Sequence, residues 1–190
     1  EDEAARFVEH FVQPLDRDDN TGYGSPVAEL IGNFNPSWDS QKDIRACFDE
    51  AVAFAGVILE KKLEAVRSIQ RAKQMVQAAL EQMQDRIVRL PQFAPWKMVL
   101  IGSEANFVVY PSQRGGYNAQ CVPEKGEAGK LKCPFPQDWA GQPAHQLKSI
   151  SGIPSLRFCH NNGFLITADT EQDAVEACRK AMERQHSADG

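Results

Sequence analysis

The feature that most constrains the fold is a long stretch without helix breakers, from Asp43 to Leu90. It contains no proline and one glycine, Gly56, and it is rich in Ala, Leu, Glu, Lys, Gln and Arg, which all favour helices. Apolar residues recur at steps of three and four along its second half, as they do on one face of a helix. The stretch therefore predicts one very long helix, or two helices with a break near Gly56 or Glu60.

The pattern changes after this stretch, where two prolines end the helical region. Short runs rich in β-formers, separated by turn signals, predict strands over 98–101, 106–110, 117–122, 156–160 and 164–167. Thr170 predicts the N-cap of a last helix, and a short helix over 4–13 is expected to stop at Pro14. The predicted fold class is α+β, with a long helix or helix pair, a small and mostly antiparallel sheet, and a C-terminal helix.

Composition limits the classes of partner. The chain has 42% hydrophobic and 25% charged residues and a formal net charge of -5. No run reaches the ~20 apolar residues that a membrane span requires, so no membrane partner is expected. The negative charge argues against binding nucleic acid by bulk electrostatics, although it is compatible with a local basic cleft. Five cysteines without a closely spaced pair indicate reduced thiols and an intracellular protein.

An acidic cluster is the first candidate site, and it consists of Asp16, Asp18 and Asp19 in a turn-rich segment. Carboxylate oxygens are the ligands that Mg²⁺ and Mn²⁺ prefer, so Asp16 or Asp19 could belong to a larger metal site. The alternative is a solvated turn in which these side chains cap the backbone.

The second candidate is the segment from Arg157 to Phe164, where a predicted strand leads into a turn. His160, Asn161 and Gly163 there, with Arg157, have the chemistry of a phosphate site, because imidazole and guanidinium donate hydrogen bonds and glycine lets a backbone amide approach an anion. The alternative is a type I′-like Asn-Gly hairpin turn with a locally hydrogen-bonded histidine.

Seven short motifs occur in one order along nearly the whole chain: Leu15-Asp16-x-x-Asp19-Asn20, Phe34-Asn35-Pro36-Ser37-Trp38, Pro95-Trp96-Lys97, Gln120-Cys121-Val122-Pro123, Trp139-x-Gly141, Ser151-Gly152-Ile153-Pro154 and Phe158-x-His160-x-x-Gly163-Phe164. Together they resemble the melanocyte-proliferating-gene family, an uncharacterised-type family labelled as metal-dependent hydrolases. That family is similar to the DHH phosphoesterases and is associated with 3′–5′ RNA exonuclease activity.

The resemblance implies that the chain corresponds to the family's C-terminal part, because the Asp-His-His motif and the other motifs of the catalytic front half do not occur in it. It then implies the end of a catalytic domain or a linker at 1–42, a connecting helix region at 43–90 and a substrate-binding α+β domain at 91–190. Mn²⁺ or Mg²⁺ belongs to the full-length protein, with Asp16 and Asp19 as part of an incomplete site. The family has an apolar residue at the position of Arg157, so a phosphate role there depends on guanidinium chemistry alone.

Two functions follow as hypotheses. In the first, the chain is part of a phosphodiesterase and binds RNA or a nucleotide phosphate, and the family resemblance places it in the cytoplasm of a prokaryote or in the mitochondria or nucleus of a eukaryote. In the second, it is a non-catalytic module that assembles through the long helix, for example as a homo-oligomer.

Overall fold

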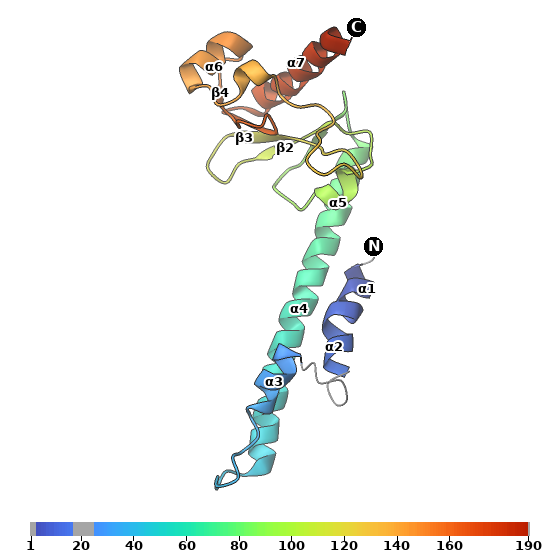
Figure 1. The fold of residues 1–190 in the computed structure, drawn as a ribbon, viewed down its shortest axis with the longest axis vertical. Coiled ribbons are helices and arrows are strands. Elements are labelled where there is room, and N and C mark those ends of the chain that lie inside the picture. Colours follow the sequence, from blue (N-terminus) through green and yellow to red (C-terminus); the bar gives the residue numbers. More distant parts are fainter. Residues whose placement is uncertain (1–2, 17–24, 190) are drawn as a thin grey trace. The chain divides into compact units, whose positions relative to one another are not determined.

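The computed structural model describes residues 3–16 and 25–189 (Figure 1), and the chain divides into two compact units between Arg71 and Ala72. The secondary-structure elements described in the first unit are all helices, and a loop over 33–43 joins the last two of them. These elements are α1 (Glu3–Phe7), the π-helix η1 (Val8–Val12), α2 (Gln13–Asp16), α3 (Pro26–Gly32) and the first part of α4 (Ile44–Glu81). Pro14 does not end the first helix as expected, because it lies in the first turn of α2, where a proline's missing N–H costs little.

Helix α4 is one continuous helix from Ile44 to Glu81, so the alternative of a break near Gly56 is wrong. It also ends before Leu90. Tighter bonds close its last turn, from Gln82 N–H to Ala79 O and from Met83 N–H to Leu80 O. Asp85 and Arg86 then take positive φ values of 51° and 58°, which a right-handed helix cannot contain.

The second unit is built on a five-stranded sheet in the order β1-β2-β3-β5-β4. Its strands are β1 (Ile87–Arg89), β2 (Phe107–Pro111), β3 (Tyr117–Cys121), β4 (Leu156–Cys159) and β5 (Leu165–Ala168). Only β1 and β2 run parallel, and the other neighbours are antiparallel. The predicted α+β class with a mostly antiparallel sheet is therefore confirmed.

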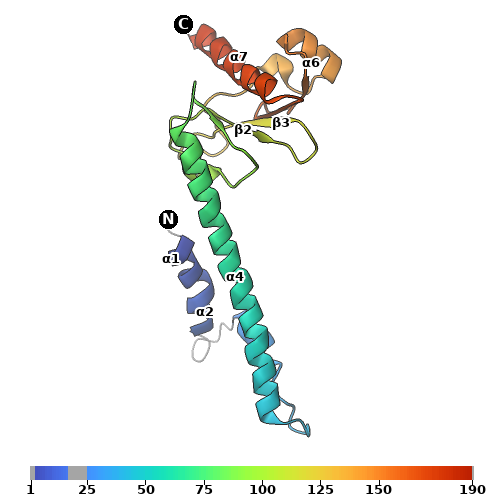
Figure 2. The same ribbon diagram turned by 180° about the vertical axis from the view of Figure 1, so that it is seen from behind.

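One face of the sheet is fully covered. Helix α7 (Glu171–Asp189) packs against β2, β3 and β5, and α6 (Ala144–Ser151) packs against β4 (Figure 2). The short helix η2 (Gln137–Trp139) places the buried Trp139 in the same core. Thr170 caps α7 as predicted, since its Oγ1 accepts the Asp173 N–H at 3.2 Å.

The opposite face is covered over β1 and β2 only. There Val88, Val108 and Tyr110 form a second core with the end of α4 and with α5 (Lys97–Leu100). The strand predicted over 98–101 is wrong, because these residues lie in or next to the short helix α5. The Leu100 N–H donates to Trp96 O, and the Leu100 side chain is buried. Strand β1 was not predicted, since its three residues continue the apolar pattern of the helix before them.

Candidate functional site

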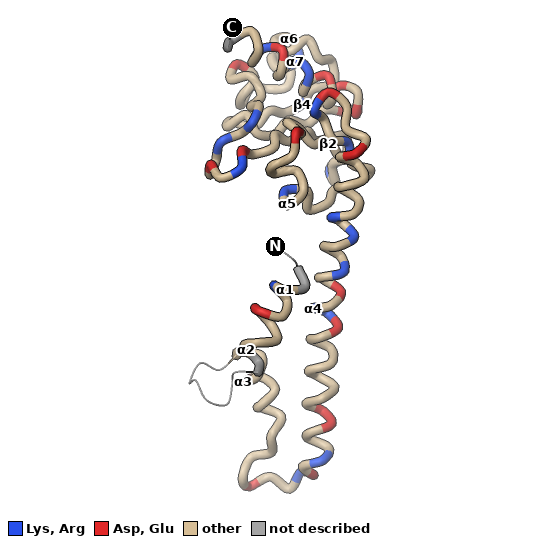
Figure 3. Tube along the Cα trace, turned by 90° about the vertical axis from the view of Figure 1, so that its right-hand side faces the viewer, with Lys and Arg blue, Asp and Glu red and all other residues tan. Residues whose placement is uncertain are grey.

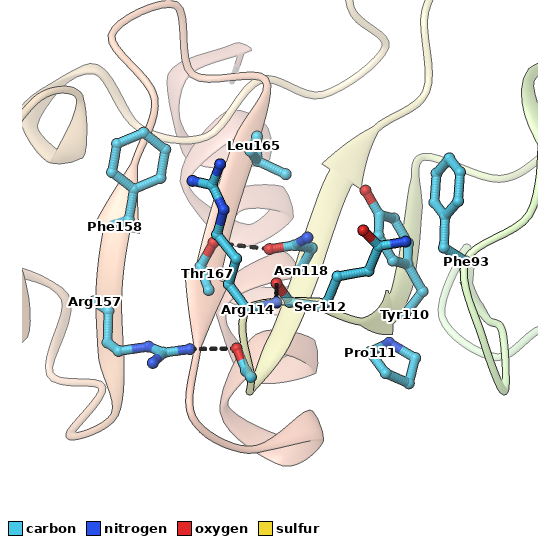
Figure 4. Close-up of a pocket in the computed structure, with 12 residues that line it drawn as sticks. Phe93, Tyr110, Pro111, Ser112, Arg114, Asn118, Arg157, Phe158, Leu165 and Thr167 are labelled. Carbon is cyan, nitrogen blue, oxygen red and sulfur yellow. Dashed lines mark hydrogen bonds between the residues drawn. The ribbon is translucent and has the colours of Figure 1, made fainter.

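A cavity of about 600 Å³ lies over the uncovered part of the sheet, on β3, β5 and β4. We call this surface the open face (Figure 4), and it comprises Phe93, Tyr110, Arg114, Asn118, Arg157, Phe158, Leu165 and Thr167. Its volume falls in the range of ~300–1,000 Å³ that is typical of small-molecule sites. Polar side chains form the floor, and aromatic rings lie at opposite sides of it.

A β-bulge in β4 brings Phe158 to the open face. Leu156 pairs with Ala168 but Phe158 pairs with Thr167, so Arg157 is an extra residue in the ladder. Without the bulge, Phe158 would point to the same side as Leu156, into the core. With it, Arg157 and Phe158 both face outward, and Phe158 is 44% exposed.

Two side-chain hydrogen bonds link three strands at the floor. Thr167 Oγ1 donates to Asn118 Oδ1 at 2.8 Å, and the Tyr110 hydroxyl donates to Gln120 Oε1 at 3.0 Å. Burial raises the pKa of the Tyr110 phenol, and the Asn118 amide partly offsets that rise. Because Asn118 Oδ1 is occupied by Thr167, its Nδ2 amino group is the part left to donate, toward Tyr110 or toward a ligand.

Arg157 lies at the rim but is already engaged. Its Nε lies 3.0 Å from Asp169 Oδ1, and its Nη2 donates to Gly115 O at 2.6 Å (Figure 4). The guanidinium thus ties β4 to the β2–β3 turn. It packs so closely that a Cβ on Gly116 would lie 2.3 Å from Arg157 Nη2 and 2.3 Å from Ala168 O.

Arg114 differs from Arg157, because its guanidinium has no hydrogen-bond or ion-pair partner among the residues that the structure describes. It extends from the β2–β3 turn into the cavity (Figure 4). The turn itself is well defined, with Ser112 N–H donating to Gly116 O at 2.9 Å and Arg114 N–H donating to Ser112 Oγ at 3.2 Å. Acidic and basic residues are interspersed along the rest of this unit (Figure 3), so the positive charge at the cavity is local.

The predicted phosphate turn continues the same side of β4. His160 N–H donates to Leu165 O at 2.9 Å, and the His160 ring lies 6.3 Å from the Phe158 ring and 4.3 Å from that of Phe164. His160 Nδ1 accepts the Asn162 N–H at 3.1 Å. A neutral ring with Nδ1 as acceptor carries its proton on Nε2, which leaves one donor for an anion.

The turn is a different type from the expected I′-like hairpin. Of the three turn residues only Gly163 has a positive φ, 62°, which fits a type I turn followed by a left-handed glycine. Gly163 is buried, and its N–H donates to His160 O at 2.8 Å. Asn161 is exposed and packs beside Gly141. His160 and Asn161 are therefore the members of the predicted set that can reach a ligand here, and phosphate binding at this turn stays a prediction.

Helix N-termini generally favour anions, but acidic side chains occupy the N-terminus of α7. Glu171 and Asp173 lie in its first turn, and Asp173 Oδ2 accepts the Ser155 N–H at 3.1 Å. These carboxylates already complement the helix dipole and would repel a phosphate. The open face, which Arg114 lines, is consequently the better candidate for an anion site in this unit.

The two predicted metal ligands lie at and beyond the end of a described segment. Asp16 is the last residue of α2, and Asp19 lies outside the described residues. Within 3–16 and 25–189, no three His, Cys, Asp or Glu side chains come together as a possible metal site. The described residues do not fit a metal ion, so we assign no chemical step to one here.

We expect the chain alone to bind Mn²⁺ weakly or not at all, since a two-metal site needs several more His and Asp ligands than this chain brings together. Isothermal titration calorimetry with MnCl₂ measures this directly, with the Asp16→Asn, Asp19→Asn double variant as the control. A micromolar or tighter affinity that the double variant loses would contradict the expectation and place a metal site at these two residues.

The five cysteines are all buried, and the structure contains no disulfide among the residues it describes. Burial raises the pKa of Cys133 to about 11 and that of Cys159 to about 12. It also raises the pKa of Cys121 and of Cys178 well above the usual value. Thiols in this state are poor nucleophiles, so these four act as core residues.

Sequence reasoning missed Arg114, Asn118 and Thr167. A signal for the last two existed, because Asn118 and Gln120 alternate with the apolar Ala119 and Cys121 in β3, as expected for a strand with one polar face. Only the bulge, which depends on pairing between β4 and β5, decides that Phe158 joins them.

The chain is thus an α+β protein whose sheet leaves one face open, with a polar floor and arginines at its rim. The family model described as "Uncharacterised protein family (UPF0160)" matches residues 6–182, and the chain belongs to this family. Curated relatives include the human "MYG1 exonuclease", 28% identical over 93% of this chain and 54% of its own length. Others are the "MYG1 protein" of Schizosaccharomyces pombe, 26% identical over 94% of this chain and 63% of its own, and that of Chlamydia muridarum, 26% identical over 92% and 63%.

These matches confirm the resemblance found in the seven motifs. The chain spans about half of the length of the human relative and under two thirds of the other two. No solved structure matches the chain. Among the described residues, no helix combines the length and the apolar character that crossing a bilayer requires.

Proposed function

We propose that this chain is the substrate-binding part of a metal-dependent phosphodiesterase that removes nucleotides from the 3′ end of RNA. The observation that carries the proposal is the open face, where Arg114, which has no partner among the described residues, and an exposed aromatic ring flank a polar floor. The exonuclease name of the human relative supports the reaction class. Resemblance to a DHH phosphoesterase, and a Mn²⁺ or Mg²⁺ ion held outside the described residues, belong to the same proposal.

Within this proposal, the chain's own residues bind and orient the RNA. His160 donates its Nε2 proton to a phosphate oxygen, and Asn161 supplies a second donor from the same turn. Both lie beyond Phe158 along the edge of the sheet, so one strand of RNA can follow β4 from the open face to the turn. Donors that contact the phosphate more strongly in the transition state lower the barrier to hydrolysis.

A 5′-labelled single-stranded RNA tests the proposal in the protein as it occurs in its cell, with Mn²⁺ supplied. We expect a ladder that shortens from the unlabelled 3′ end and stops when EDTA is added. His160→Ala should lower the rate by ~10- to 1,000-fold, the scale for loss of one transition-state donor. The control is His145→Ala, which changes an exposed histidine on α6 of the same unit.

Immediate release of a labelled mononucleotide would show digestion from the 5′ end and contradict the proposed direction. Full activity in the His160→Ala protein would remove the turn from the substrate site. No RNA hydrolysis with any divalent metal ion would reject the phosphodiesterase proposal.

A second candidate function is assembly through α4, and a row of exposed apolar residues favours it. Ile44, Phe48, Val52 and Leu59 are 73%, 58%, 54% and 43% exposed and lie on one side of the helix. Such a row often marks a protein interface. A homo-oligomer through this helix is one form of it. A module that only assembles would bind no RNA, so the RNA measurements below separate it from the substrate-binding role.

A further inference from the structure

We infer that the open face binds one unpaired nucleotide of the RNA, with its base stacked on Phe158 and its phosphate held by Arg114. This inference rests on the proposed function and names a subsite within it. Three features of the second unit carry it, namely an exposed ring, a cation that no other described residue pairs with, and a pre-oriented polar floor.

Phe158 supplies a stacking platform. The residue is 44% exposed, although Leu156 and Cys159 of the same strand are buried. The bulge at Arg157 is what turns the ring outward, and bulges commonly re-aim side chains beside functional sites. An exposed aromatic ring on a sheet binds unpaired bases of any sequence, because every base has a π-face.

Arg114 supplies the positive charge. Arg157 gives its Nε to Asp169 and one N–H to Gly115 O, so much of its charge is already compensated. Arg114 has no such partner among the described residues and lines the same cavity. The two arginines therefore have different roles: Arg157 positions the β2–β3 turn, and Arg114, carried by that turn, contacts the phosphate. We therefore assign the phosphate contact to Arg114, and a phosphate role for Arg157 itself stays a prediction.

The polar floor of the cavity favours unpaired RNA over a duplex. The Thr167 hydroxyl donates to Asn118, so Thr167 offers its lone pairs and Asn118 its amino group to a ligand. A base edge can use such a donor and acceptor only when it is not paired with another base. The cavity of about 600 Å³ has room for one nucleotide. Phe93, which meets Tyr110 edge to face at 5.3 Å, forms the opposite wall.

Fluorescence anisotropy with the full chain tests the subsite, using a fluorescein-labelled ten-nucleotide single-stranded RNA and a blunt duplex of the same sequence. We expect the single strand to bind more tightly than the duplex. Phe158→Ala should weaken single-strand binding about 5- to 150-fold, which corresponds to the loss of one base–aromatic stack, while Phe158→Tyr should keep the affinity. The control Phe48→Ala, which removes an exposed ring of the first unit, should leave the affinity unchanged.

Arg114→Gln tests the phosphate contact without touching the core, because the residue lies in an exposed turn. We expect at least about tenfold weaker binding. The slope of log affinity against log salt should fall by about 0.7, the value for one phosphate contact to a single strand. The matched control is Arg67→Gln on α4, which should change neither quantity.

The outcomes separate this inference from the proposed function. RNA that binds equally well to the parent, Phe158→Ala and Arg114→Gln proteins would overturn the subsite and leave the proposed function standing. Equal affinity for duplex and single strand would also overturn the subsite. No RNA binding by the parent chain would overturn the subsite and the substrate-binding role together, and would favour assembly through α4.

Discussion

Raising the pH from 9 to 10 is expected to lower the free energy of unfolding of the second unit by about 4 kcal/mol. Burial raises the pKa of Cys121, Cys133, Cys159 and Cys178 in the folded chain, whereas in the unfolded chain each thiol loses its proton near pH 8.5. The folded state then binds more protons than the unfolded state, so stability falls as the pH rises through this window. Each thiol contributes about 1 kcal/mol over this pH unit.

Guanidinium denaturation at a series of pH values, followed by tryptophan fluorescence, measures the effect, because Trp96 and Trp139 are buried in this unit. Trp38 is 97% exposed and adds a nearly constant background. The Cys178→Ala variant is the control for the cause. It will be less stable at every pH because of the cavity it leaves, but its loss of stability between pH 9 and 10 should be about a quarter smaller. A loss that this variant reproduces in full would mean that groups other than the thiols are responsible.

Replacing Gln77 with proline is expected to cost about 3 kcal/mol or more. Gln77 is exposed within α4, next to Val76, which is fully buried in the second core. Proline there removes a helical hydrogen bond, and its ring clashes with the carbonyl oxygen of Lys73. The change should therefore displace Val76 and Ala72 from that core. It alters only one exposed side chain.

Gln77→Ala is the matched control, since alanine keeps the backbone N–H and favours the helix. Thermal denaturation of the two variants beside the parent gives the comparison. A Gln77→Pro protein that melts at the same temperature as the parent would show that residues 73–81 are not helical.

Local chemistry made several elements predictable. The long helix followed from the absence of proline and the presence of a single glycine between Asp43 and Glu81. The turn between the strands predicted over 106–110 and 117–122 contains two glycines, which take φ values of 82° and 73°. The cap at Thr170 needed only a hydroxyl and a following N–H. These features depend on residues close together in the chain, which is why sequence patterns report them.

The wrong predictions of secondary structure share one physical cause: tertiary contacts outweighed the local preference of the segment. The composition of residues 98–101 is typical of a strand. In the structure they form a single helical turn, which buries Leu100 in the second core. Ile87 and Val88 continue the helical apolar pattern, yet they pair with β2, because that pairing buries one of them on each face of the sheet. Pairing partners and burial decide such short segments, and neither is visible in a local window.

For the candidate site, the sequence by itself determined the chemistry on offer: an Arg in a Gly-rich turn, polar residues alternating along β3, and a His-Asn-Asn-Gly turn after β4. It also determined the family through its ordered motifs. Only the tertiary structure decided where these groups lie. The register of β4 on β5 creates the bulge that exposes Phe158, and the pairing of Arg157 with Asp169 and Gly115 leaves Arg114 as the arginine that can reach a ligand. Such outcomes depend on contacts between residues far apart in the chain, and no local pattern encodes them.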